Sequence, residues 1–214
     1  MSTLSRRRIE LRLRETREAK RLVITPLLSV KQFGDISVDL RLGNQFIVFR
    51  MHMGGFMNPF KLSDVQLRSL QERRVVRFGQ EFVLHPGQLA LGSTFEYLQM
   101  PSDLEGQVEG RSSWARVGLQ IATATCVEPG FSGVVTLELS NTGTMPLELF
   151  PGVRVAQLVL RDVNPAIEHP YAGKRKYNRA IGPQFSRLTS DEDAKPFTRK
   201  VRSPLDDPSA DLLS

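Results

Sequence analysis

Residues 134–139 read Val-Val-Thr-Leu-Glu-Leu, and Asn141-Thr-Gly143 follows them almost directly. Branched and apolar side chains dominate the six residues, which is the composition of a β-strand that is at least half buried. Asn and Gly tolerate the backbone of a tight reversal, so the second stretch predicts a turn. This strand and its turn indicate a mainly β protein.

Short runs of the same kind recur along the chain at intervals of about 8 to 12 residues. We expect further strands at residues 46–49, 81–85, 89–95, 118–123 and 153–160. Pro86-Gly87, Pro129-Gly130 and Pro151-Gly152 predict the turns between them. This spacing favours a β-sandwich or a barrel.

Two short helices interrupt the predicted strands. Ser5 is a candidate N-cap, with Leu4 and Ile9 at the positions of a hydrophobic staple. A second helix is predicted to start at Ser63, which opens the capping-box sequence Ser-Asp-Val-Gln, and to end near Arg74.

The composition is that of a globular protein. The chain has 214 residues, of which 40% are hydrophobic, so it can bury a full core without disulfides. Its one cysteine, Cys126, excludes an internal disulfide and a cysteine-rich zinc site, and we expect it to be a small buried hydrophobe. No run of about 18 apolar residues occurs. We therefore expect a soluble, cytoplasmic protein with no membrane partner.

The two ends of the chain differ from its middle. Residues 1–22 carry eight Arg and Lys against three Glu, so eight minus three, or +5, of the formal net charge of +6 lies there. Such a run is usually a solvated helix face, and nucleic-acid binding is the less favoured interpretation. Residues 191–214 lose the apolar pattern, and we expect a disordered tail after one domain spanning residues 1–190.

Residues 110–116, Gly-Arg-Ser-Ser-Trp-Ala-Arg, are the most unusual local sequence. Backbone donors, two serine hydroxyls and two guanidinium groups in one turn suit a chain of phosphates. The residues leave a second interpretation equally open, in which the serines only cap neighbouring amides.

Glu138 is the acidic residue of the strand predicted at residues 134–139. Apolar surroundings would raise the pKa of its carboxyl group into a range useful for proton transfer. The alternation leaves the opposite possibility open, since Glu138 could share a solvent face with Thr136 and Ser140. Glu128, just before Pro129, could contact a ligand or only open a turn.

Together these stretches resemble the dCTP deaminase family, whose superfamily also contains the trimeric dUTPases. The resemblance covers most of the chain and rests on residues 36–43 (Ile-Ser-Val-Asp-Leu-Arg-Leu-Gly), 85–91, 101–104, 110–119, 128–133, 137–139 and 141–143, with Lys176-Tyr177, Gly182-Pro183 and Ser186-Arg187. Motifs in this order and at this density are specific.

The resemblance implies a dUTPase-like distorted β-barrel or jelly roll that forms homotrimers, with active sites where subunits meet. It implies the conversion of dCTP and water to dUTP and ammonia, which feeds deoxyuridine and thymidine nucleotide synthesis. No zinc takes part, and Mg²⁺ accompanies the triphosphate through phosphate oxygens.

By position, the resemblance implies that Glu138 is the general base, with Ser112 and Arg116 around the attacking water. It implies that the following residues contact the nucleotide: Arg111, Ser113, Ala124, Glu128, Thr136, Tyr171 and Lys176. It implies no metal ligand from the protein itself. Residues 171–187 would form a lid over the nucleotide.

The chain departs from the family at two of these places. Glu128 stands where the family usually has Asp, and Ala180 stands where a base-contacting Gln is expected. These departures keep two alternatives open. One is a dUTPase-type or bifunctional enzyme, and the other is a catalytically weakened, nucleotide-binding regulatory homologue.

Overall fold

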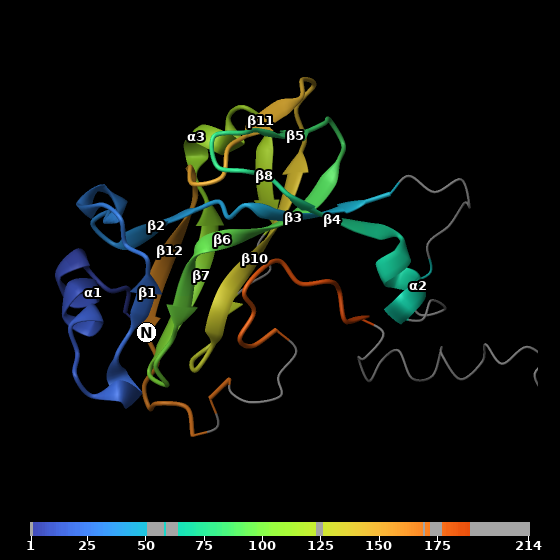
Figure 1. Cartoon of the computed structure of the whole chain (residues 1–214). Helices are drawn as coiled ribbons and strands as arrows, with labels where there is room; N and C mark the ends of the chain where they lie inside the picture. Colours follow the sequence, from blue (N-terminus) through green and yellow to red (C-terminus); the bar gives the residue numbers. More distant parts are fainter. Residues whose placement is uncertain are drawn as a thin grey trace, which may run out of the picture. The chain divides into compact units, whose positions relative to one another are not determined.

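The computed structural model describes residues 2–50, 58, 64–122, 126–168, 170–171 and 177–188. Its helices are short: α1 (Arg6–Leu13), η1 (Glu18–Lys20), η2 (Val30–Gln32), α2 (Asp64–Ser69) and α3 (Ser112–Ala115). Its strands are β1 (Val23–Thr25), β2 (Ser37–Arg41), β3 (Gln45–Phe49), β4 (Gln71–Val75), β5 (Phe82–Leu84), β6 (Leu89–Gln99), β7 (Leu104–Gly110), β8 (Leu119–Ala122), β9 (Cys126–Val127), β10 (Ser132–Asn141), β11 (Leu147–Leu149) and β12 (Arg154–Asp162) (Figure 1). The expected mainly β class is confirmed.

The strands form three sheets with antiparallel pairing. One has the order β4-β3-β6-β10-β8, and β1 also pairs with β6. A second has the order β2-β12-β7-β9, and a third pairs β11 with β5. Neighbouring strands are far apart in sequence, as in a jelly roll.

A single hydrophobic core draws on the two larger sheets. Leu40 of β2 and Leu158 of β12 belong to the same buried cluster as Phe46 of β3 and Leu137 of β10, and all four side chains are fully buried. The ring of Phe46 stacks on that of Phe82 with a centroid distance of 4.1 Å. Burial of these side chains, at about 1.5–3 kcal/mol each, is the main term that favours the fold.

The first predicted helix is confirmed as α1. Ser5 is its N-cap residue, although its side chain makes no capping hydrogen bond, and the staple residues Leu4 and Ile9 are both fully buried. The second helix is shorter than predicted. Its proposed cap, Ser63, lies outside the described residues, and α2 ends at Ser69 rather than near Arg74 because the chain continues into β4.

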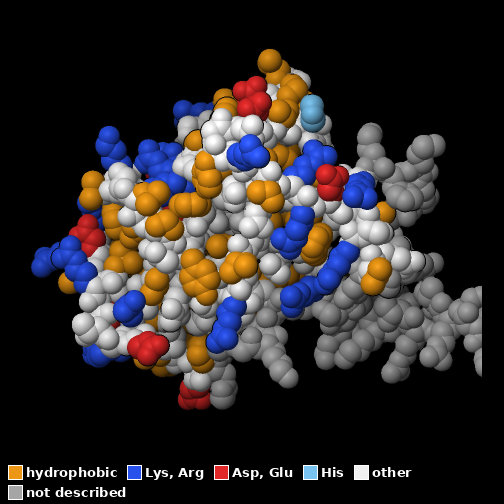
Figure 2. Space-filling view, in the orientation of Figure 1, with side chains coloured by type: hydrophobic (Ala, Val, Ile, Leu, Met, Phe, Trp, Pro, Cys, Tyr) orange, Lys and Arg blue, Asp and Glu red, His pale blue; other side chains and the backbone are white. Residues whose placement is uncertain are grey.

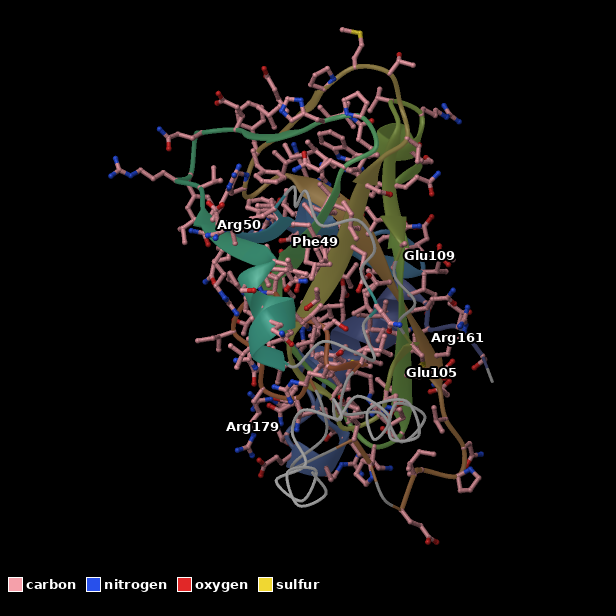
Figure 3. All side chains as sticks on the ribbon, turned by 90° about the vertical axis from the view of Figure 1, so that its right-hand side faces the viewer. Phe49, Arg50, Glu105, Glu109, Arg161 and Arg179 are labelled. Atoms are coloured by element: carbon pink, nitrogen blue, oxygen red, sulfur yellow. The ribbon has the colours of Figure 1, made fainter. Side chains whose placement is uncertain are left out.

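The chain packs as two compact units. One consists of residues 1–48 and 73–184, and the other of residues 49–72 and 185–214. The second unit begins at Phe49 and Arg50, which Figure 3 labels, and Arg50 pairs with Glu72 at 3.7 Å. Within the same unit the Arg68 guanidinium lies 5.7 Å from the centre of the Phe185 ring. The expected boundary at residue 190 and the tail after it lie outside the described residues.

None of the helices in the described ranges has the length and apolar character needed to cross a membrane.

Candidate functional site

A β-bulge interrupts the pairing of the strand that carries Glu138. The register of β10 against β6 shifts between Val134, which pairs with Tyr97, and Thr136, which pairs with Ser93. Within the shift, Thr94 Oγ1 accepts a hydrogen bond from the backbone nitrogen of Val135 at 3.0 Å. The hydroxyl thus replaces a missing partner in the ladder. Between the two pairs β6 advances by four residues (97 minus 93) and β10 by two (136 minus 134), so the bulge lies in β6 and interrupts the pairing just before Glu138.

Glu138 follows the bulge and lies in a row of apolar residues. Its cross-strand partners are Leu91 of β6 and Ala122 of β8, and Leu91 is paired in turn with Ile47 of β3. Leu91 and Ile47 are buried. The Glu138 Oε2 atom is itself buried and has no hydrogen-bond partner among the residues that the structure describes. Desolvation therefore raises the pKa of Glu138 above its ordinary value, against the opposing effect of one backbone hydrogen bond.

The alternation of β10 left open whether Glu138 is buried or faces solvent, and the structure places it between these two cases. Glu138 does share a face of β10 with Thr136 and Ser140, but all three residues are half-buried rather than solvated. An unpaired, desolvated carboxyl group is costly in a folded protein. Its raised pKa also makes it a better proton acceptor than a solvated carboxylate.

The serine-arginine turn forms α3, directly after β7. Arg111 is its N-cap residue, and Ser112, Ser113 and Arg116 are exposed. Neither serine side chain caps the helix, and within the described ranges neither hydroxyl has a hydrogen-bond partner. The capping interpretation is therefore not supported, and both hydroxyls are available to a ligand.

Arg111 belongs to a charged network at the base of this turn. Asp39 of β2 lies between two arginines, with Oδ2 3.0 Å from Arg154 Nη1 and Oδ1 3.6 Å from Arg111 Nε. The carbonyl oxygen of Arg154 accepts from Arg111 Nη1 at 3.3 Å and from Trp114 Nε1 at 3.0 Å. Sequence reasoning missed Asp39 and Arg154 as site residues, although Asp39 lies within the quoted residues 36–43.

A hollow of about 340 Å³ adjoins this network. It is lined by Ser29, Lys31, Gln32, Arg41, Gly152, Val153 and Arg154. Its three basic residues and the neighbouring Arg111 make the surroundings suitable for an anion. Arg41 is tied to the buried Glu96, which lies 3.3 Å from it, so its charge is partly compensated.

Glu138 and the α3 turn belong to different elements, since Glu138 lies in β10 and α3 follows β7. No hydrogen bond or ion pair of the described residues joins Glu138 to Ser112 or Arg116. The connection between them is β8, which starts three residues after Arg116 and ends at Ala122, opposite Glu138. Ala124, which follows, lies outside the described residues, as does Lys176.

Residues 177–184, called the C-terminal segment below, lie along the first half of β10. The backbone nitrogen of Arg179 donates to Ser132 O at 2.5 Å, and that of Val134 donates to Ala180 O at 2.8 Å. In Figure 1 this segment, in orange, runs beside β10. Arg179 has φ of +59°, an unusual backbone conformation for a residue other than Gly. Its side chain is exposed at the edge of the protein in Figure 3.

Two predicted nucleotide contacts lie where this segment begins. The backbone nitrogen of Tyr171 donates to Pro129 O at 2.6 Å, and its ring lies 6.0 Å from that of Phe131. Glu128 is exposed, and its carbonyl oxygen accepts from the nitrogen of Phe131 at 3.0 Å, so it does open a turn. These contacts connect the turn after β9 to Tyr171, which precedes the C-terminal segment.

A larger hollow, of about 700 Å³, lies beside α1. Its basic side chains are mostly compensated, because Arg8 pairs with Asp162 at 2.9 Å and Arg12 pairs with Asp103. Figure 2 shows basic side chains over α1 and again across the middle of the same face.

The expectation for Cys126 is wrong, because this residue is exposed. Its Sγ atom lies 3.6 Å from Glu105 Oε2, and Glu105 in turn pairs with Arg161 at 3.6 Å, next to it in Figure 3. Desolvation and then the Glu105 carboxylate raise the pKa of the thiol. Over the residues that the structure covers, no group of three or more His, Cys, Asp or Glu side chains is placed to hold a metal ion.

Comparison with known proteins gives consistent matches. The sequence model of a family described as dCTP deaminase-like matches residues 4–163. A protein of Methanosphaera stadtmanae named "dCTP deaminase, dUMP-forming" is 40% identical over 177 residues, which are 81% of this chain and 89% of that protein. A "dCTP deaminase" of Halorubrum lacusprofundi is 43% identical over 176 residues, or 80% and 86% of the two chains.

One solved structure supports the fold. The crystal structure of 2'-deoxycytidine 5'-triphosphate deaminase from Agrobacterium tumefaciens aligns with a TM-score of 0.55 and 23% identity. The alignment covers 75% of this chain and 48% of that one. This alignment supports a shared fold.

Proposed function

The chain belongs to the dCTP deaminase-like family, and from this premise we propose that it is a dCTP deaminase that converts dCTP and water to dUTP and ammonia. The observation that carries the chemistry is the Glu138 carboxyl group, which is desolvated and has one oxygen atom without a partner. A cytosine ring and a single water molecule would supply the missing partners.

In the proposed mechanism Glu138 handles the protons. Its carboxylate accepts a proton from the water as the water oxygen bonds to C4 of cytosine, which gives a tetrahedral intermediate. The same proton then passes to the amino nitrogen, the bond from C4 to that nitrogen breaks, and ammonia leaves. The proton of the C4 hydroxyl group moves to N3 as the C4 carbonyl forms, which gives uracil. The raised pKa of Glu138 favours uptake of the proton from the water, because burial disfavours the charged carboxylate.

Ser112 and Arg116 would hold the water and stabilise charge that develops at the reacting centre. Arg111 and Ser113 would bind the triphosphate, together with the basic hollow beside Arg154. Mg²⁺ would arrive with the substrate and stay bound to phosphate oxygens and water, since Asp39, the carboxylate that pairs with Arg111, already holds two arginines. Thr136, Tyr171, Lys176, Ala124 and Glu128 complete the proposed nucleotide contacts.

The separation of Glu138 from the α3 turn supports a homotrimer with shared sites. Glu138 lacks a partner for one oxygen atom, while Ser112 and Arg116 are exposed in the same chain. A neighbouring subunit could bring its α3 turn to this Glu138, so that each site combines two chains. A cytoplasmic location, in which the exposed thiol of Cys126 stays reduced, is part of the same proposal.

A second candidate function is a bifunctional reaction that releases dUMP. The names of the relatives favour it, because the Methanosphaera protein and one of Methanobrevibacter smithii, 39% identical over 187 residues, are both called dUMP-forming. The deaminase of Halorubrum, at 43%, carries no such addition, so identity alone does not separate the two.

One assay tests both candidates. The purified protein is incubated with Mg²⁺ and either dCTP or dUTP, and ammonia, dUMP and pyrophosphate are measured. Ammonia from dCTP without pyrophosphate supports the deaminase, and ammonia with stoichiometric pyrophosphate and dUMP supports the bifunctional enzyme. Pyrophosphate from dUTP without ammonia from dCTP indicates a dUTPase. Tight nucleotide binding without turnover contradicts both proposals and indicates a regulatory homologue.

A further inference from the structure

The C-terminal segment reaches the face of β10 that carries Glu138. Gly133 and Ala180 form a parallel bridge, and further along in the same direction the backbone nitrogen of Gln184 donates to Thr136 Oγ1 at 3.1 Å. Thr136 and Glu138 are two residues apart on one face of the strand, a separation of about 7 Å. The Gln184 side chain therefore starts beside Thr136, on the face of β10 that carries the Glu138 carboxyl group.

The amide of Gln184 is held in one orientation. Its Nε2 atom donates to the carbonyl oxygen of Gly182 at 3.0 Å, and because that carbonyl can only accept, the nitrogen must face it. The Oε1 atom of Gln184 has no hydrogen-bond partner among the described residues. The residue is half-buried. An acceptor that is held in a fixed orientation and has no donor among the described residues is available to a ligand.

The loop before Gln184 is fixed by close packing and by a hydrogen bond from Arg73. Gly182 and Pro183 are buried, and a β-carbon on Gly182 would lie 2.6 Å from Gln45 Oε1. Pro183 O accepts from Arg73 Nη2 at 3.2 Å. Ala180 is 7% exposed and docks through its backbone, so its methyl group offers no polar contact to a ligand. Of these residues, only Gln184 combines a free acceptor with proximity to Thr136.

We propose that Gln184 is a specificity-determining residue that selects cytosine over uracil, with Oε1 accepting a hydrogen bond from the C4 amino group of the substrate. Uracil carries a carbonyl oxygen at C4, and two acceptors facing each other cannot hydrogen-bond. The proposal rests on the proposed function. To the proposed function, this assignment adds the group that recognises the base. It predicts that the product dUTP binds more weakly than the substrate dCTP.

The test measures dCTP and dUTP dissociation constants, by calorimetry, for the full chain with Glu138→Gln in all samples so that dCTP is not consumed. We expect Gln184→Ala to reduce the preference for dCTP over dUTP by about tenfold, the value of one hydrogen bond of about 1.4 kcal/mol. Gln184→Glu keeps an acceptor and should retain the preference for dCTP. Gln80→Ala, on a surface turn, is the matched control and should leave both constants unchanged.

A dCTP preference within twofold of the parent protein in Gln184→Ala would overturn the proposal. An equal loss of affinity for both nucleotides would also overturn it, because it would mean that Gln184 only docks the segment. If Gln184→Ala fails to fold, Gln184→Asn, which shortens the side chain by one methylene group, should still lower the preference. Turnover of dCTP by the unmodified protein is measured separately, so a failure of the proposed function is distinguishable from a failure of this assignment.

Discussion

Gly133 and Ala180 lie so close that no side chain fits between them. A β-carbon on Gly133 would lie 2.9 Å from the backbone nitrogen of Ala180 and 3.1 Å from its carbonyl oxygen. The φ of Gly133 is +146°, which residues with a side chain rarely adopt. The close approach is what lets the C-terminal segment dock on β10 by its backbone.

Gly133→Ala is therefore expected to detach this segment. We expect the KM for dCTP to rise severalfold, and trypsin to cleave after Arg179 faster than in the parent protein, because the Arg179 backbone no longer bonds to Ser132. Gly87→Ala is the matched control. Gly87 also has positive φ, +73°, but an added β-carbon would meet nothing within 4 Å. Equal effects of the two substitutions would show that backbone strain, and not the lost contact, is responsible.

Glu138→Gln should abolish deamination and leave dCTP binding intact. The amide is nearly isosteric with the carboxylate but cannot accept a proton from water, so we expect kcat to fall by about 10²-fold to 10⁴-fold. Ammonia release measures the rate, and calorimetry measures binding. Turnover near the parent rate would remove Glu138 from the mechanism.

The same substitution should stabilise the protein at neutral pH. Burial raises the pKa of Glu138 in the folded chain, so ionisation costs stability as the pH rises from the unfolded value, near 4.5, through the folded one. Gln carries no such cost. We expect a gain of roughly 1 kcal/mol at pH 7, as is common when a functional residue is replaced, and no gain below about pH 4, where Glu138 is neutral in both states. Urea unfolding at the two pH values checks this difference.

Local sequence patterns predicted the strands that have apolar runs. Residues 46–49, 89–95 and 153–160 fall within β3, β6 and β12, respectively, apart from one residue at the start of the last range. β4 was missed because Gln-Glu-Arg-Arg-Val, at residues 71–75, has no apolar run of its own. Its strand conformation depends on pairing with β3, more than twenty residues earlier, and such distant pairing leaves no local signal.

The site was predictable in its residue types but not in its geometry. The alternation of β10 could not decide the burial of Glu138, since that depends on Leu91 and Ile47 from two other strands. The bridge between Gly133 and Ala180 joins residues 47 positions apart, 180 minus 133, and is equally invisible in the sequence. Motif resemblance supplied the candidate residues, and only the packing shows how each one is held.

A buried network anchored on Glu96 holds β2 to β6. Glu96 is fully buried, and its carboxylate accepts from the backbone nitrogen of Arg41 at 2.7 Å and from Gln32 Nε2 at 2.9 Å. Glu96→Ala would leave the Arg41 guanidinium buried without its counter-charge, so we expect a loss of about 3–5 kcal/mol in unfolding free energy. Glu148→Ala, an exposed residue of β11, should change it by less than about 0.5 kcal/mol. Similar midpoints of urea unfolding for the two variants would contradict the assigned role of the network.

Asp39 should control phosphate binding through the arginines that it separates. Asp39→Asn keeps the shape of the side chain but removes the charge that holds Arg154 at 3.0 Å and Arg111 at 3.6 Å. Each arginine side chain then gains conformational freedom, which dCTP binding must remove again. We therefore expect the KM for dCTP to rise about tenfold, the size expected for the loss of a hydrogen bond to a charged group. The kcat should change by less than about twofold. Asp162→Asn, which removes the partner of Arg8 beside α1, is the matched control and should leave both constants unchanged. A fall in kcat at unchanged KM would instead place Asp39 at the reacting centre and not at the phosphates.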